Sequence, residues 1–186
     1  MAKGKRSGVD WSKHVVSTDP HGNTVVIHTL GIPGSKMQEV VFINCQGVMT
    51  VTGDYGIWVF NREFMPSPKE SEVIEHYWCE KATGNTSQEI YEFDPEGTEA
   101  LIDEWIVALK QESPEGHSGQ ENVLIDYLES CRSIIHDGDQ YYRVRAHDLK
   151  PNSVDRDQVP YQSKIKTWLL IVFDAWEEIC RQLREE

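Results

Sequence analysis

Three side chains close together in the sequence could stack against a flat ligand. Tyr55, Trp58 and Arg62 lie in the stretch VTGDYGIWVFNREFMPS. Aromatic rings and a guanidinium plane are groups on which a nucleotide base or a partner side chain stacks. The alternative is a structural role, because aromatics on strands are mostly buried. Residues 57–60 are apolar throughout, which predicts a strand covered on both faces, with Trp58 or Phe60 under a C-terminal helix and the other under a second helix or a partner.

Histidine and aspartate also occur in an order that could hold a metal. The members of this set are His117, the dipeptides His136-Asp137 and His147-Asp148, and Asp174. The order resembles that of the histidine-aspartate phosphohydrolases, which use it to hold a divalent metal that activates water. The surrounding residues do not otherwise match that family. The sequence therefore favours a protein without catalytic residues, metal or cofactor, with a metal-dependent phosphohydrolase as the enzymatic alternative.

Other motifs of catalysis and metal binding are missing from the sequence. No serine or cysteine lies in a G-x-S-x-G frame, no histidines are spaced as H-E-x-x-H, and no glycines follow a phosphate-loop spacing. Cys45, Cys79, Cys131 and Cys180 are widely separated, so neither a zinc ribbon nor a disulfide framework is indicated. Dispersed thiols and the absence of a membrane-length apolar run predict a cytoplasmic protein.

The acidic residues are concentrated in one segment. The formal net charge is −13, and fourteen acidic residues face only two basic ones between Glu89 and Asp139. Such a charge repels nucleic acid and attracts basic surfaces, so direct nucleic-acid binding is disfavoured. We expect the partner-binding residues of an acidic face to include Asp103, Glu104, Asp126 and Glu129. The alternative is a solvated face that keeps the protein soluble.

The first half of the chain has the pattern of antiparallel strands. β-Branched runs flank a turn cluster at residues 19–23, and further apolar runs at 39–45, 48–52 and 57–60 are separated by glycine-containing turns. This spacing predicts a meander of four or five strands. Residues 69–82 fit either a short helix capped by Ser71 or another strand.

The second half has the periodicity of helices. Apolar residues recur at helical spacing after Asp94-Pro95, again over 120–135, and most strongly over 161–183. QEIYEF is expected to add an edge strand, and QYYRVRAHDL fits a strand or a helix. We predict an α+β fold in which an antiparallel N-terminal β-meander packs against C-terminal helices. Residues 1–13 are expected to be a basic tail and 14–186 a single domain, mainly strands over 14–94 and mainly helices over 95–186.

Four stretches carry a resemblance to a family of small uncharacterised proteins encoded by bacteriophages and prophages. They are VTGDYGIWVFNREFMPS, YWCEK, EFDPE and WLLIVFDAWEEICRQL. The resemblance spans about residues 14–183. It implies a phage accessory protein in the bacterial host cytoplasm, and no catalytic residue.

Together these observations suggest a non-enzymatic protein that binds and inhibits a host factor, through an acidic surface that mimics nucleic acid. Its partner would be a host protein with a basic surface, without membrane contact, and the C-terminal helix could also form a homodimer. One alternative is a protein that sequesters a nucleotide through Tyr55, Trp58 and Arg62, with Arg143 or Arg145. A further alternative is a structural or assembly protein.

Overall fold

The computed structural model describes residues 6–22, 24–67, 71–83, 90–112, 119–137, 141 and 160–185. The chain forms two compact units, the first made of residues 1–90 with 165–186 and the second of residues 91–164. Unit 1 contains the strands β1 (Val15–His21), β2 (Val25–Gly31), β3 (Val40–Cys45), β4 (Val48–Gly53) and β5 (Trp58–Phe60), with the helices α1 (Glu75–Lys81) and α5 (Thr167–Glu185). Unit 2 contains α2 (Pro95–Glu112) and α3 (Gly119–Ile134). The prediction of a single domain over 14–186 is not tested by this division and stays a prediction.

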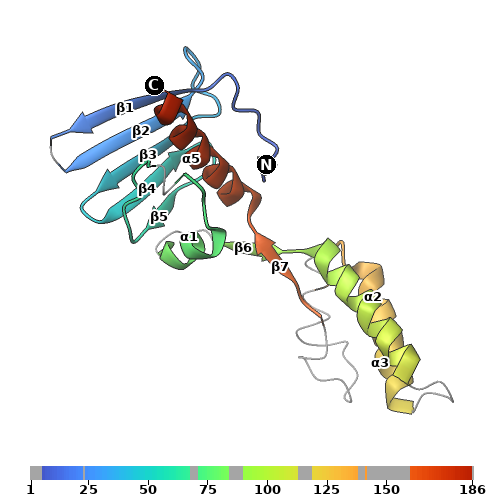
Figure 1. Ribbon diagram of the computed structural model, residues 1–186. Coiled ribbons are helices and arrows are strands. Elements are labelled where there is room, and N and C mark those ends of the chain that lie inside the picture. The colour runs from blue at the N-terminus through green and yellow to red at the C-terminus, as the bar shows by residue number, and fades with distance from the viewer. Residues whose placement is uncertain are drawn as a thin grey trace. The chain divides into compact units, whose positions relative to one another are not determined.

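The sheet of unit 1 is an antiparallel meander of five strands in the order of the sequence, β1-β2-β3-β4-β5 (Figure 1). The predicted α+β class is therefore confirmed, with the N-terminal sheet packed against α5. Burial alternates residue by residue along β3, as expected of a sheet with one covered face. Gln46 and Gly47 both have positive φ, the geometry of the two-residue turn that joins β3 to β4.

The turn after β1 is shorter than the sequence suggests. Asp19, Pro20 and His21 belong to β1 and pair with β2, and the chain turns only after them. Proline is tolerated there because β1 is an edge strand of the described sheet, so the missing N–H costs no ladder bond.

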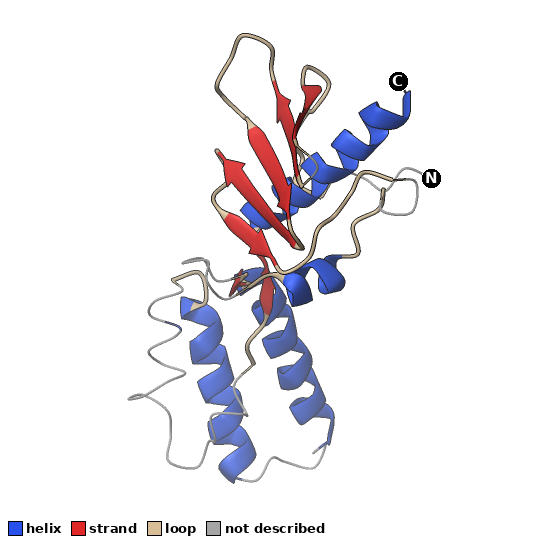
Figure 2. Ribbon diagram, turned by 90° about the vertical axis from the view of Figure 1, so that its left-hand side faces the viewer, coloured by secondary structure: helices blue, strands red, loops and turns tan. Residues whose placement is uncertain are grey.

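Helix α5 covers one face of the sheet, as the views in Figures 1 and 2 both show. Trp176 of α5 is fully buried, with its ring 5.3 Å from that of Phe42 on β3 and 5.7 Å from that of Trp78 on α1. Trp78 in turn stacks on Phe64 at 4.0 Å. These aromatics form the centre of the unit 1 core.

Trp58 and Phe60 lie on the same face of β5, and both are completely buried. The sequence predicts that one of them lies under α5 and the other under a second helix or a partner. Residues two apart on a strand point to the same side, so both side chains enter the one core beneath α5 and α1. The opposite side of β5 carries the half-buried Val59.

The structure decides the ambiguous segment at residues 69–82 and contains the strand expected in QEIYEF, while a second ambiguous segment lies almost wholly outside the described residues. Residues 75–81 form α1, whose N-cap is Ile74 without a side-chain cap, so Ser71 does not cap it. The strand expected in QEIYEF is β6 (Tyr91–Phe93), and it pairs with β7 (Ser163–Ile165) in a separate two-stranded sheet. The segment QYYRVRAHDL lies outside the described residues except for Tyr141, as do Arg143 and Arg145.

Residues 6–13, part of the expected basic tail, lie against the rest of unit 1. Trp11 is buried, with 1% of its surface exposed, and its ring lies 4.7 Å from that of His14. Trp11 therefore belongs to the unit 1 core, whereas Gly8, Asp10, Ser12 and Lys13 of the same segment are exposed.

Candidate functional site

The acidic residues singled out in the sequence lie on the helix pair α2–α3 of unit 2. Pro95 opens α2, a position where a missing N–H costs nothing. The two helices enclose a small apolar core that includes Ile102, Leu128 and Cys131. Because this core occupies one stripe of each helix, the charged residues are left on the remaining surface.

Both basic side chains of α2 and α3 are neutralised by acidic residues of the opposite helix. Lys110 Nζ lies 3.2 Å from Glu129 Oε1, and Arg132 Nε lies 3.2 Å from Asp103 Oδ1. Arg132 also lies 3.4 Å from Glu99. Between the two ion pairs is an open depression of about 540 Å³, with Ile106 and Val107 among its lining residues. The ion pairs therefore connect the helices on one side of the pair.

The other two predicted partner-binding residues are placed differently. Glu104 and Asp126 are exposed and have no ion pair within the described part of the chain. Consecutive residues are about 100° apart around a helix, so Glu104 does not share the surface of Asp103. The structure thus divides the four predicted residues into two that stabilise the helix pair and two that offer unneutralised charge to solvent.

The predicted stacking residues do not form one surface. Trp58 is 0% exposed, and its indole Nε1 donates a hydrogen bond of 2.9 Å to the carbonyl of Tyr55. A ring without exposed surface cannot stack on a ligand. Tyr55 is half-buried against the core, and burial, with a smaller effect of the charge on Asp54, raises its pKa. Trp58 and Tyr55 therefore serve the packing of the meander.

Arg62 takes part in a different cluster, formed with residues of α1. Its guanidinium carbon lies 5.1 Å from the ring centre of Phe64 and 5.2 Å from that of Tyr77, and its Nη1 donates to the Tyr77 hydroxyl. Lys81 Nζ lies 5.1 Å from the same tyrosine ring. Two cations thus share one aromatic ring, which fastens the chain after β5 to α1.

The histidines and aspartates with metal-binding order do not form a described metal site. His136 Nε2 lies 3.4 Å from Glu99, and the carboxylate of Asp174 accepts hydrogen bonds from Arg6 and Ser7. His117, His147 and Asp148 lie outside the described residues. Within the described ranges, no group of three or more His, Cys, Asp or Glu side chains has a metal-holding arrangement.

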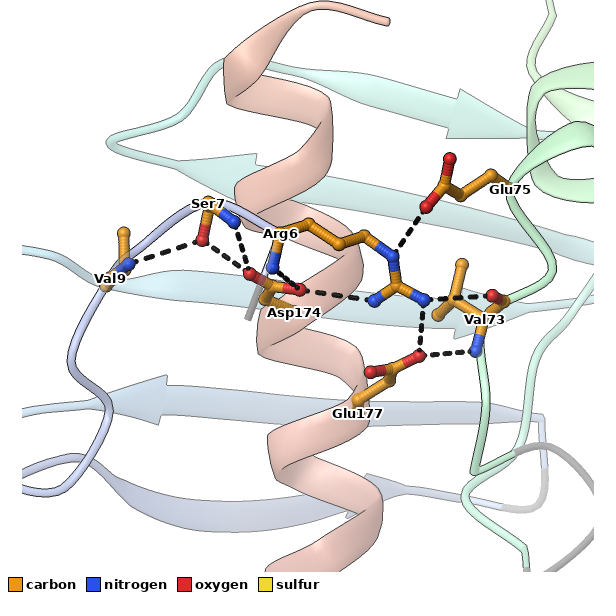
Figure 3. A network of polar contacts seen from close by, with 7 residues as sticks. All are labelled: Arg6, Ser7, Val9, Val73, Glu75, Asp174 and Glu177. Carbon is orange, nitrogen blue, oxygen red and sulfur yellow. Dashed lines mark hydrogen bonds and ion pairs between the residues drawn. The ribbon is translucent and has the colours of Figure 1, made fainter. Parts of the chain in front are cut away.

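The contacts of Asp174 are the feature that the sequence did not predict. A carboxylate in the middle of the apolar stripe of α5 is buried and bonded to residues near the start of the chain (Figure 3). The available signal was the acidic residue itself, because a buried charge requires a partner. The partner could not be identified, since it is 168 residues away in sequence.

No helix in the described ranges is long and apolar enough to cross a membrane. Comparison of the chain with protein families, with curated proteins and with solved structures found no match.

Proposed function

We propose that the protein is a non-enzymatic binding protein of phage or prophage origin, which inhibits a host factor by contacting a basic surface with its helix pair α2–α3. The observation that carries the proposal is the charge of this pair. The helices contain eight acidic and two basic residues, and both basic side chains are already paired. The remaining carboxylates give the pair a net negative field that attracts a basic surface.

The support for a mimic of nucleic acid is electrostatic. The backbone that bears these exposed carboxylates is already ordered in the two helices, so only side-chain entropy is lost when a partner binds. Glu104 and Asp126 are the two predicted residues with this character. The phage origin and the inhibitory role rest on the family resemblance in the sequence.

The proposal is tested by reversing only the unpaired charges. We expect the double variant Glu104→Lys with Asp126→Lys to lose at least about tenfold in partner capture from bacterial lysate, because repulsion replaces attraction at the contact. Capture by the unaltered protein should weaken as salt rises well above about 0.1 M, where the Debye length falls below about 10 Å.

A matched control places the same charge change on unit 1. Asp19 and Glu80 are exposed acidic residues of that unit; Asp19 lies 3.1 Å from His21 Nε2, and Glu80 forms a surface ion pair with Lys81. The variant Asp19→Lys with Glu80→Lys should capture the partner normally. Equal loss in both variants would show a non-specific effect of net charge, and unchanged capture by the α2–α3 variant would reject the proposal.

A further inference from the structure

The guanidinium of Arg6 is surrounded by three carboxylates from two separate elements (Figure 3). Its Nε donates to Glu75 Oε1 at 2.6 Å, its Nη1 to Asp174 Oδ1 at 3.2 Å and its Nη2 to Glu177 Oε1 at 2.9 Å. Nη2 also donates to the carbonyl of Val73 at 3.2 Å. All three guanidinium nitrogens of Arg6 thus donate hydrogen bonds to separate acceptors. A lysine ammonium, with a single nitrogen, could not form this set of bonds.

Asp174 also accepts hydrogen bonds from the backbone of Arg6 and Ser7 and from the side chain of Ser7. Its carboxylate accepts the Arg6 N–H at 3.3 Å, the Ser7 N–H at 2.8 Å and the Ser7 hydroxyl at 2.6 Å. The residue is only 5% exposed. The site therefore binds an Arg-Ser pair by its backbone as well as by its side chains.

The carboxylates at this site carry more charge than their occupant. Three carboxylates surround one cation, although one pair would satisfy a structural salt bridge. Burial works against the charged form of Arg6, and its bonds to Glu177, Glu75 and Asp174 more than offset this, so the pKa of Arg6 lies above its ordinary value. An excess of negative charge around a guanidinium is a property of sites that attract cationic segments.

One of the carboxylates is held in place by a contact that does not involve Arg6, because Glu177 Oε1 accepts the N–H of Val73 at 2.7 Å. The carboxylate of Asp174 bonds only to Arg6 and Ser7 among the contacts described, and its backbone lies near the middle of the 19-residue α5. Glu177 and Val73 therefore stay joined when the occupant leaves, and the backbone of Asp174 stays fixed within α5.

The occupant itself can leave without unfolding the sheet. Arg6 and Ser7 precede Gly8, which has a φ of +70° and beside which a Cβ would meet no atom within 4 Å. The buried Trp11 then anchors the segment. Only the residues before that anchor need to move to vacate the site.

We propose that Glu75, Asp174, Glu177 and the carbonyl of Val73 form a binding site for an arginine-containing segment, occupied within the chain by Arg6-Ser7 and open to an arginine of another chain when Arg6 is displaced. This site is made of residues of unit 1, whereas α2 and α3 belong to unit 2, so the inference does not depend on the function proposed above.

The test uses the full-length Arg6→Ala variant and a synthetic peptide with the sequence of residues 3–9, KGKRSGV. The variant should melt at a lower temperature than the unaltered protein, and the peptide should raise its Tm and bind with 1:1 stoichiometry in calorimetry. The unaltered protein, whose site is filled, should bind the peptide at least about tenfold more weakly. A folded variant that shows no binding would overturn the proposal.

Further variants separate the site from general charge effects. Arg181→Ala makes the same charge change on α5 but removes an exposed arginine, and it should not create peptide binding. Adding Asp174→Asn to Arg6→Ala should abolish binding. A peptide with lysine in place of arginine should bind at least about tenfold more weakly, and equal binding would contradict a guanidinium site.

If Arg6→Ala does not fold, the variant Arg6→Lys takes its place, because it keeps the positive charge and removes the planar guanidinium. It should still bind the arginine peptide better than the unaltered protein does. Failure of this folded variant to bind would equally overturn the proposal, as would tighter binding of Ca²⁺ than of the peptide.

Discussion

The side-chain oxygen of Gln182 on α5 accepts a hydrogen bond of 2.9 Å from the backbone N–H of Val16 on β1. The amide nitrogen of the same glutamine donates to the carbonyl of His14 at 2.9 Å. A side-chain amide thus pairs with an edge strand as a neighbouring strand would. Since alternate residues of an edge strand point outward, the next outward N–H groups would be those of Thr18 and residue 20, and Pro20 has none. Neither Val16 nor Pro20, near the two ends of β1, therefore has a free outward N–H to offer to a strand of another chain.

Replacing Gln182 with alanine should destabilise unit 1 by about 1–2 kcal/mol, because two hydrogen bonds to the backbone are lost. It should also increase self-association, since the N–H of Val16 becomes available to a second strand. Urea denaturation and sedimentation check the two effects. In Gln182→Glu the acceptor for Val16 is kept, so association should stay low, and association equal to that of the alanine variant would contradict this role.

Trp176 and Trp168 lie on the same helix in opposite environments. Trp176→Ala should cost about 3–5 kcal/mol of stability, because the ring is fully buried among Phe42, Trp78 and Phe64. Trp168 is 53% exposed, and its replacement by alanine should cost less than about 1 kcal/mol. Chemical denaturation of both variants measures the two losses of stability. Similar losses would contradict the prediction.

His28 should make unit 1 less stable in mild acid. Burial lowers the pKa of its ring, which touches Thr18 through Nδ1. Below the ordinary pKa of about 6.5 the unfolded chain binds a proton that the folded chain does not, so stability falls as pH decreases from about 6.5 toward the lowered pKa. The slope due to this group is at most about 1.4 kcal/mol per pH unit.

Urea denaturation at pH 7.5 and pH 5.5 measures the effect. His28→Gln should reduce the difference between the two values, whereas His21→Gln, at an exposed position, should leave it unchanged. An identical pH dependence in all three proteins would show that His28 makes no contribution.

Alanine variants of Gly53 and Gly47 distinguish the cost of a steric clash from the cost of a strained backbone. Both have positive φ, but a Cβ at Gly53 would lie 2.1 Å from the carbonyl oxygen of Glu39, while one at Gly47 would meet nothing within 4 Å. Gly47→Ala should cost about 1–2 kcal/mol from the left-handed backbone alone. Gly53→Ala should cost at least about 2 kcal/mol more, because backbone atoms must move. Thermal unfolding of the pair measures the difference, and equal losses would mean that the sheet absorbs the clash.

Local patterns in the sequence were sufficient to predict the meander. Each strand pairs with the next, so a turn such as Gln46-Gly47 and the apolar runs beside it contain the information for the pairing. The same applies to α5, although its periodic stripe includes the exposed Trp168. That residue lies in the first turn, because the helix begins at Thr167 and not near Tyr161.

Contacts between distant segments could not be predicted in the same way. The partner of β6 is β7, some seventy residues later, and nothing in QEIYEF identifies it. Likewise the stretch KGKRSG is typical of a solvated tail, and only the position of Asp174 in three dimensions gives Arg6 its role. At the predicted acidic site, the charges could be read from the sequence, but the pairing of Asp103 and Glu129 with basic residues could not.

The order of the elements also affects the newly made chain. β5 ends at Phe60, whereas the helix that covers its inner face begins at Thr167. At a synthesis rate of about 5–20 residues per second, the sheet waits roughly 5–20 s for that helix. During this interval Phe42, Trp58 and Phe60 have no cover from α5, so the nascent chain exposes an aromatic surface to solvent.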